Sequence, residues 1–216
     1  MSAPVIISIE GNIGSGKSTL VSILHKLYKD NSDYCFLQEP VDIWNTIKDE
    51  GGVTILQRFY EDTERFAFQF QMMAYISRLA ILRDSLKKPH KYIISERCVY
   101  TDANVFAKML YDDKKITLIE YTIYRKWFDE FISDIPQPKI VYVKTTPETA
   151  YERVIKRGRL GETIPIEYLR KCNEYHDNWL NNTHYDMLLL DGNQDINQTP
   201  SIVDEWVSNI GEFVTK

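Results

Sequence analysis

Residues 9–20, IEGNIGSGKSTL, restrict the fold of this chain more than any other stretch. They contain the pattern G-x-x-x-x-G-K-[ST] between a short apolar run typical of a strand and a run typical of a helix. Glycines let successive backbone N–H groups turn toward one anion, and the N-terminus of the following helix adds partial positive charge. We therefore predict a nucleoside triphosphate site, in which Lys17 reaches the β- and γ-phosphates and the Ser18 hydroxyl ligates Mg²⁺. The residues expected to form it are Gly11, Asn12, Ile13, Gly14, Ser15, Gly16, Lys17, Ser18 and Thr19.

Composition limits the remaining classes of protein. A chain of 216 residues with 44% apolar residues can form one α/β domain over residues 1–216. The net charge of −5 argues against a protein that mainly binds nucleic acid. The three cysteines form no C-x-x-C pair, which favours a reducing compartment, and the four histidines do not cluster as a zinc site would require. No apolar run is long enough to span a membrane, and the start of the chain leaves no room for a signal peptide, so we expect the cytoplasm.

Short apolar runs alternate with helical patterns along the whole chain. Runs rich in Val, Ile and Leu without polar alternation indicate strands that are covered on both faces, as in a parallel sheet. The expected strands are residues 5–9, 34–39, 92–96, 139–145 and 187–191. The expected helices are residues 17–29, 57–86, 101–111, 117–134, 147–158, 165–181 and 199–214. This order predicts a doubly wound, five-stranded parallel sheet with helices on both faces, and ligands at the carboxyl ends of its strands.

Three further strings follow the predicted strands. They are QEPVDIW after the second, SERCVYTDANVF after the third and TTPETAYERVIKRGRLGETIP after the fourth. Together with the glycine loop, they resemble the deoxyribonucleoside kinase family of the deoxycytidine/deoxyguanosine kinase type, from about residue 5 to residue 196. The resemblance implies a P-loop kinase fold with an arginine-rich lid at about residues 153–164. It also implies ATP–Mg²⁺-dependent phosphorylation of a deoxyribonucleoside 5′-hydroxyl, a homodimer, and feedback inhibition by a deoxynucleoside triphosphate.

The strand ends supply candidate catalytic residues. A carboxylate opposite the phosphate loop can accept the proton of an attacking hydroxyl, and the resemblance gives this role to Glu39. A helix-capping or surface carboxylate is the alternative. The resemblance puts Glu96 near Mg²⁺ with Ser18, and Arg97 near the 5′-oxygen and the transferring phosphoryl group, whereas a weak surface ion pair is the alternative for both. Cys98 replaces the serine that the family carries after this arginine.

The arginine-rich string predicts a segment that closes over phosphates. Arg153 and Arg157 are four residues apart and share one helix face, which could also be a solvated basic surface. The resemblance implies that both, with Arg159, clamp the triphosphate. It also suggests a contact between Glu162 and the sugar 3′-hydroxyl. LDGNQD, which begins at Leu190 and includes Asp191, resembles the loop that contacts the base of the phosphate donor.

Residues 60–80 supply most of the expected nucleoside pocket. Gln71, Ala74 and Arg78 share one helix face, and the amide of Gln71 can pair with the edge of a base. A pair between Arg78 and Asp102 suits the exocyclic amine of cytosine or adenine and disfavours thymine, although a purely structural salt bridge remains the alternative. The resemblance adds aromatic walls and a sugar contact, from Trp44, Phe70, Phe106 and Tyr60.

Two other functions fit the glycine loop. A nucleoside monophosphate kinase of the thymidylate kinase type shares this fold, but its acceptor phosphate needs extra cations near the second and third strand ends. A non-catalytic nucleotide-binding subunit is expected to have lost Lys17, Glu39 or Arg97, and this chain keeps all three. The sequence therefore favours a kinase for deoxycytidine or purine deoxynucleosides.

Overall fold

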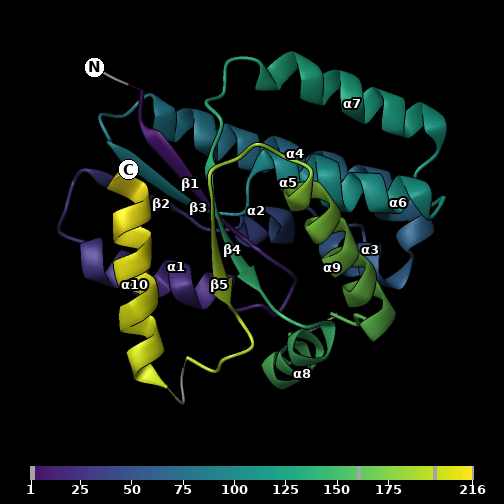
Figure 1. Cartoon of the computed structure of the whole chain (residues 1–216). Helices are drawn as coiled ribbons and strands as arrows, with labels where there is room; N and C mark the ends of the chain where they lie inside the picture. Colours follow the sequence, from purple (N-terminus) through teal and green to yellow (C-terminus); the bar gives the residue numbers. More distant parts are fainter. Residues whose placement is uncertain (1–2, 160–161, 197–198, 216) are drawn as a thin grey trace.

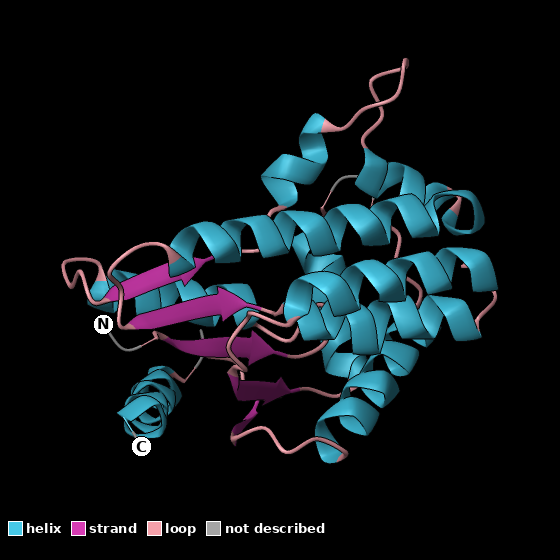
Figure 2. Cartoon of the chain, turned by 90° about the horizontal axis from the view of Figure 1, so that it is seen from above, coloured by secondary structure: helices cyan, strands magenta, loops and turns pink. Residues whose placement is uncertain are grey.

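The computed structural model describes residues 3–159, 162–196 and 199–215. Residues 160 and 161, which belong to the predicted lid, lie outside the described residues. A five-stranded parallel sheet forms the centre of the molecule, with strand order β2-β3-β1-β4-β5 (Figure 1). Its strands are β1 (Val5–Glu10), β2 (Tyr34–Leu37), β3 (Tyr92–Glu96), β4 (Lys139–Lys144) and β5 (Met187–Asp191). All five lie where the apolar runs predicted them, and their arrows run in the same direction in Figure 2.

Helices cover both faces of the sheet because both faces are apolar. On one face, α1 (Lys17–Tyr28) and α10 (Pro200–Thr215) bury side chains such as Leu24 and Ile210 against β1, β3, β4 and β5. The opposite face packs against α4 (Thr63–Leu86), α7 (Leu118–Ile132) and α9 (Ile166–Asn181). Figure 1 shows the strands between these two groups of helices. Loops and helix ends meet at the carboxyl end of the sheet, which the helices do not cover.

The helix predicted over residues 57–86 is two helices in the structure. The first, α3, spans Ile55–Glu61, and α4 begins at Thr63. Asp62 separates them because its backbone leaves the helical region, with φ −143° and ψ 74°, and its carboxylate accepts the N–H of Arg65 as an N-cap. The aspartate therefore ends one helix and starts the next.

The helix predicted over residues 101–111 is also subdivided. It consists of α5 (Val99–Thr101), a π-helical turn η1 (Asp102–Ala107) and α6 (Lys108–Asp112). Such wide turns are rare and occur often at functional sites. Here the π-helical turn carries both Asp102 and Phe106, two of the residues predicted for the nucleoside pocket.

The other helices follow their local start signals. The hydroxyl of Thr146 caps α8 (Pro147–Arg157), which has proline in its first turn, and α7 starts with a capping box between Thr117 and Glu120. A further short helix, α2 (Val41–Thr46), was not predicted. No helix in the described part of the chain has the length and hydropathy needed to cross a membrane.

Candidate active site

A cavity of about 430 Å³ opens at the carboxyl ends of the central strands. It brings together nearly all the residues predicted for the site, although they come from distant parts of the chain. Those that line it are Ile13, Gly14, Ser15, Gly16, Lys17, Ser18, Thr19, Glu39, Trp44, Tyr60, Phe70, Gln71, Ala74, Arg78, Glu96, Arg97, Asp102, Phe106, Arg153, Arg157, Arg159 and Glu162. The phosphate loop and the predicted base pocket therefore face one continuous space.

The phosphate loop depends on close backbone packing at two glycines. Gly11 has φ 145° and Gly14 has φ 84°, and a Cβ atom at either position would lie about 2.4–2.5 Å from a carbonyl oxygen of a neighbouring element. The Asn12 side chain, beneath the loop, donates to the carbonyl of Leu169 at the start of α9. These contacts fix the loop against α8 and α9, so that its N–H groups form a rigid cradle.

Lys17 lies in this cradle with almost no exposure to solvent. Its Nζ donates to the carbonyl oxygen of Asn12 at 2.6 Å, and its side chain lines the cavity. Burial, together with the positive charge of Arg97, lowers the pKa of Lys17 to about 7, against the weaker opposing effects of the nearby carboxylates. A phosphate group at this position would favour the charged ammonium form.

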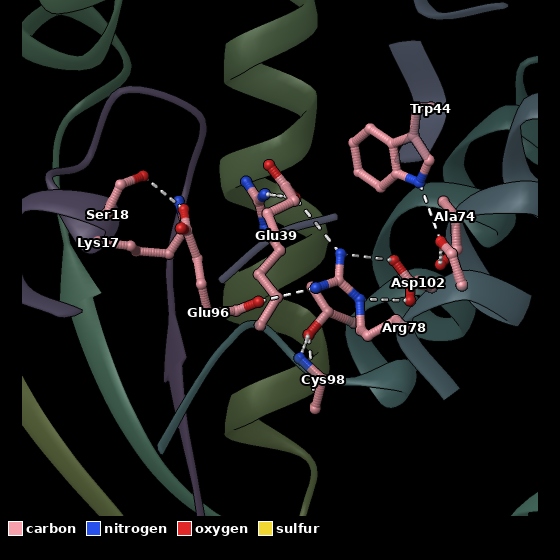
Figure 3. Close-up of polar contacts among 12 residues, drawn as sticks. Lys17, Ser18, Glu39, Trp44, Ala74, Arg78, Glu96, Cys98 and Asp102 are labelled. Carbon is pink, nitrogen blue, oxygen red and sulfur yellow. Dashed lines mark hydrogen bonds and ion pairs between the residues drawn. The ribbon is translucent and has the colours of Figure 1, made fainter. Parts of the chain in front are cut away.

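Ser18 and Glu96 form the only pair of predicted metal ligands. The Ser18 hydroxyl donates to Glu96 Oε1 at 2.6 Å, across the junction of α1 and β3 (Figure 3). Among the described residues, no group of three or more His, Cys, Asp or Glu side chains could hold a metal by itself. One carboxylate and one hydroxyl fit Mg²⁺, which commonly takes its remaining ligands from substrate phosphates and water. The donor set therefore fits a metal that arrives with a nucleotide.

Glu39 lies across the cavity from the phosphate loop, between two buried arginines. Its Oε1 accepts from Arg97 Nη1 at 2.6 Å and from Arg78 Nη2 at 3.3 Å. Burial would raise the pKa of Glu39, but the charges of Arg97, Arg78 and Lys17 outweigh it and hold the pKa at about 2. The carboxylate is therefore ionised at neutral pH, and 19% of its side chain still faces solvent.

The backbone of Arg97 adopts the left-handed region, with φ 60°. This conformation costs a residue with a Cβ atom roughly 1–2 kcal/mol. Arg97 is 4% exposed, its guanidinium lies over the ring of Phe106 at 5.1 Å, and its Nη2 donates to the Gly11 carbonyl at 3.4 Å. The guanidinium thus joins the phosphate loop to Glu39, at the expense of a strained backbone.

Arg78 connects the base pocket to Glu39. Its Nε donates to Asp102 Oδ2 at 2.8 Å, while Nη1 donates to the backbone carbonyl of Glu96 at 2.7 Å. Figure 3 shows this guanidinium between Asp102 and Glu39. Burial raises the pKa of Asp102, although the Arg78 charge opposes this. The predicted pair is therefore present, and both partners are almost fully buried.

Aromatic rings enclose the space next to this pair. Trp44 meets Phe70 edge to face at 5.2 Å, and its indole N–H donates to the Ser77 hydroxyl at 2.9 Å. Gln71 is 3% exposed and lines the cavity together with Phe106. This part of the cavity, the base slot, has aromatic walls and one buried amide, which suits an uncharged heterocycle.

The arginines of the predicted lid have different partners. Arg153 donates to backbone carbonyls of the loop after β5, including Gly192 at 2.7 Å, so it ties that loop to α8. Arg157 and Arg159 both pair with Glu162, at 2.6 Å and 3.7 Å, and the Glu162 side chain is 3% exposed. The two lid arginines thus share one carboxylate at the edge of the cavity.

Three predicted residues do not line the cavity. Gly11 and Asn12 are the first two residues of the phosphate loop and point no atoms into the lining, and Asp191 accepts from Asn193 and Gln194 within its own loop. Other lining residues were not named by the sequence analysis, namely Leu56, Phe59, Lys156, Tyr168, Ile196 and Trp206, whereas Gln194 and Asp195 belong to the predicted LDGNQD string. Lys156 lies within the arginine-rich string and Phe59 beside Tyr60, so proximity in sequence could have indicated both. Nothing in the sequence around Trp206 pointed to the cavity.

Comparison with known proteins identifies relatives over nearly the whole chain. A family model described as deoxynucleoside kinase matches residues 7–215. The chain is 37% identical over 219 residues to a probable deoxycytidine kinase of fowlpox virus, covering 97% of this chain and 88% of the viral protein. Human deoxycytidine kinase is 36% identical over 238 residues, with coverage of 97% and 90%. A mitochondrial deoxyguanosine kinase of Xenopus laevis is 30% identical over 238 residues, with coverage of 96% and 89%.

Proposed function

Because the chain belongs to the deoxynucleoside kinase family, we propose that it transfers the γ-phosphoryl group of ATP to the 5′-hydroxyl of a deoxyribonucleoside. The observation that carries this proposal is the position of Glu39, which faces the phosphate loop across a single cavity. Among the described residues, the cationic side chains that form ion pairs with Glu39 are Arg97 and Arg78, and Arg78 is also paired with Asp102. This arrangement suits a neutral hydroxyl acceptor better than the phosphate of a nucleoside monophosphate. We further propose that residues 1–216 act as one catalytic domain.

The transfer requires three separate roles, which we assign to Glu39, Arg97 and Lys17. The cradle and Lys17 hold the β- and γ-phosphates, so that the terminal phosphorus points toward Glu39. With a pKa of about 2, Glu39 is a weak base that mainly orients the hydroxyl and takes its proton late, once the new bond has formed. Arg97 already contacts Glu39 and stabilises negative charge that develops on the transferring group. Mg²⁺, bound by Ser18 and Glu96 with phosphate oxygens, would neutralise charge on the β- and γ-phosphates.

The base slot supports a preference for deoxycytidine or purine deoxynucleosides over thymidine. Asp102 keeps free lone pairs beside its bonds from Arg78, and these can accept an exocyclic amine. Thymine would present a carbonyl oxygen and a methyl group to this buried carboxylate. Gln71 then pairs with the remaining base edge, while Tyr60 and Glu162 contact the sugar. The names of the relatives, deoxycytidine and deoxyguanosine kinases, agree with this preference.

We also propose a homodimer formed through α7. Its residues Ile119, Ile123 and Trp127 lie four apart on one helix face and are 74%, 39% and 47% exposed, whereas the opposite face buries Tyr124 and Phe128. An exposed apolar stripe of this kind is typical of a surface covered by a partner. A self-complementary contact between two copies of α7 would bury it.

The shape of the cavity supports feedback inhibition by a deoxynucleoside triphosphate. Because the base slot and the phosphate loop open into one space, a single molecule can place its base beside Gln71 and its phosphates at Lys17. Such a ligand excludes both substrates.

The three cysteines are free thiols, which supports the reducing cytoplasm as the compartment of the protein.

One assay tests the proposed reaction. ADP release is measured with ATP–Mg²⁺ and each natural deoxyribonucleoside in turn, with thymidylate as the monophosphate control. We expect turnover with deoxycytidine or purine deoxynucleosides and none with thymidylate. Glu39→Gln should lower kcat by about 10²- to 10⁴-fold while ATP binding is kept. ATP binding without turnover of any nucleoside would instead identify a non-catalytic subunit, and turnover of thymidylate alone would identify a monophosphate kinase.

A further inference from the structure

The carboxylate of Glu10 is completely buried at the end of β1, outside the residues to which the reaction has been assigned. Its Oε1 accepts three hydrogen bonds: from the Ser8 hydroxyl at 2.6 Å, the Cys98 backbone N–H at 3.0 Å and the Thr101 hydroxyl at 2.6 Å. Its Oε2 has no hydrogen-bond partner among the described residues, and none of their cationic side chains forms an ion pair with it. An unpaired buried carboxylate is costly, so its presence needs a reason.

The three donors indicate that reason, because two of them lie within four residues after Arg97. Cys98 is the next residue and the N-cap of α5, and Thr101 is the last residue of that short helix. The strand register places Ile9 beside Glu96, so Glu10 lies opposite the turn that follows β3. Glu10 therefore binds the backbone at the point where the chain leaves the sheet and enters the site.

Two successive residues of β1 hold the turn on either side of Arg97. The Arg97 N–H donates to the Ile9 carbonyl at 3.0 Å, and the next N–H, that of Cys98, donates to Glu10. Between these two bonds Arg97 adopts its left-handed conformation. Residues other than glycine persist in this region only where their surroundings fix the backbone. From this backbone the Arg97 side chain reaches Glu39, with 2.6 Å between Nη1 and Oε1.

We propose that Glu10 is a positioning residue for phosphoryl transfer, which holds Arg97 in its left-handed turn through the Cys98 N–H and the Thr101 hydroxyl. Glu10 does not touch substrate or the reacting atoms in this proposal; it acts through Arg97. The side chain of Glu10 suits this place because one of its oxygens accepts three donors at once, two of them from the segment that follows Arg97. The inference rests on the proposed function of Arg97 in the transfer.

The test uses Thr101, whose hydroxyl can be removed without a change of shape. Thr101→Val deletes one donor to Glu10 and should lower kcat about tenfold or more, because small displacements of a catalytic group are costly. The KM for ATP should stay within about twofold, since the phosphate cradle is untouched. Thr101→Ser keeps the hydroxyl and should retain kcat within about threefold. Ser85→Ala, which removes a buried hydroxyl bound to Ile81 and Cys35 far from the cavity, is the matched control.

A double-mutant cycle with Arg97→Ala separates positioning from general support of the fold. If Glu10 acts through Arg97, Thr101→Val should change kcat by less than about twofold once Arg97 has been replaced. Glu10→Gln, which keeps the side-chain shape, is a second variant for the same cycle. The inference is overturned if either variant lowers kcat by the same factor in both backgrounds, or if both keep kcat within twofold of wild type.

The same cycle distinguishes this inference from the proposed function. A wild-type protein that phosphorylates no nucleoside, or an Arg97→Ala variant with unchanged kcat, refutes the assigned reaction or the role of Arg97, and with it the premise. If the wild type is active and Arg97→Ala strongly lowers kcat, the premise holds. The double-mutant cycle then tests the role of Glu10 alone.

Discussion

Replacing Arg78 by methionine is the most informative single change in the base slot. Arg78 is 5% exposed and donates to Asp102, to the carbonyl of Glu96 and to Glu39. Methionine fills much of the same volume but carries no charge. The substitution therefore leaves Asp102, which is 2% exposed, without its cationic partner.

The expected loss of stability follows from that orphaned carboxylate. Removing one partner of a buried ion pair costs about 3–5 kcal/mol, because the remaining charge is neither solvated nor compensated. Adding Asp102→Ala to the Arg78→Met variant removes this charge, so the double variant should regain more than about 1.5 kcal/mol relative to Arg78→Met. Asp102→Ala alone should cost less than Arg78→Met, because Arg78 keeps its contact with Glu39.

Equilibrium unfolding in urea measures all three variants against the wild type. The pH dependence provides an internal check. Burial raises the pKa of Asp102, and without Arg78 only the weaker effect of the Arg97 charge opposes this rise. Between its unfolded and folded pKa values the folded state then binds more protons, so the Arg78→Met variant should gain stability as the pH falls from 7 toward 5. The double variant lacks this group and should not show that gain.

Additive losses would refute this reasoning. If the double variant unfolds with the summed free-energy loss of both single variants, Arg78 and Asp102 are not coupled, despite the 2.8 Å between Nε and Oδ2. The difference in unfolding free energy between Arg78→Met and the double variant should also depend on pH. If it does not, a charged Asp102 without a partner is not its cause.

Three further predictions concern selectivity, protonation and assembly. The double variant Arg78→Met, Asp102→Ala should raise kcat/KM for thymidine relative to deoxycytidine by about tenfold or more, and an unchanged ratio would contradict the assignment of these residues to base selection. Because burial and Arg97 lower the pKa of Lys17 to about 7, ATP binding at pH 8 should take up on the order of one proton, and almost none at pH 6. Titration calorimetry in buffers of different ionisation enthalpy measures this uptake, and Lys17→Arg should abolish it; equal uptake in that variant would assign the proton to another group. Trp127→Glu should convert a dimer to a monomer in light scattering, whereas Leu27→Glu, at a 58% exposed position on α1, should not; a wild-type monomer would contradict the dimer.

The sequence predicted those parts of the molecule that local patterns encode. The glycine loop specifies its own backbone, and continuous β-branched runs such as residues 92–96 specify buried parallel strands. Parallel topology then brings the strand ends together, so Glu39 and Glu96 could be assigned to one site before any distance was known.

Other features depend on contacts that no local pattern encodes. The break at Asp62 depends on one residue that fits a helix interior poorly but caps the next helix well, so the apolar periodicity on both sides concealed it. Glu10 contacts residues that lie 88 and 91 positions further along the chain. Its position directly after the strand predicted over residues 5–9 gave no sign of this role. Trp206 similarly lines the cavity because α10 packs on the same face of the sheet as α1.

The carboxylate of Glu162 has a consequence for which anions the protein retains. Because Arg157 and Arg159 already share this internal counter-ion, an incoming anion must compete with it before it gains either guanidinium. A single inorganic phosphate gains few contacts to compensate for breaking the ion pairs of Glu162 with these arginines. In the proposed reaction, a chain of three phosphates bound by the glycine cradle would displace it. Glu162 would then act as an internal competitor that favours the nucleotide over small anions.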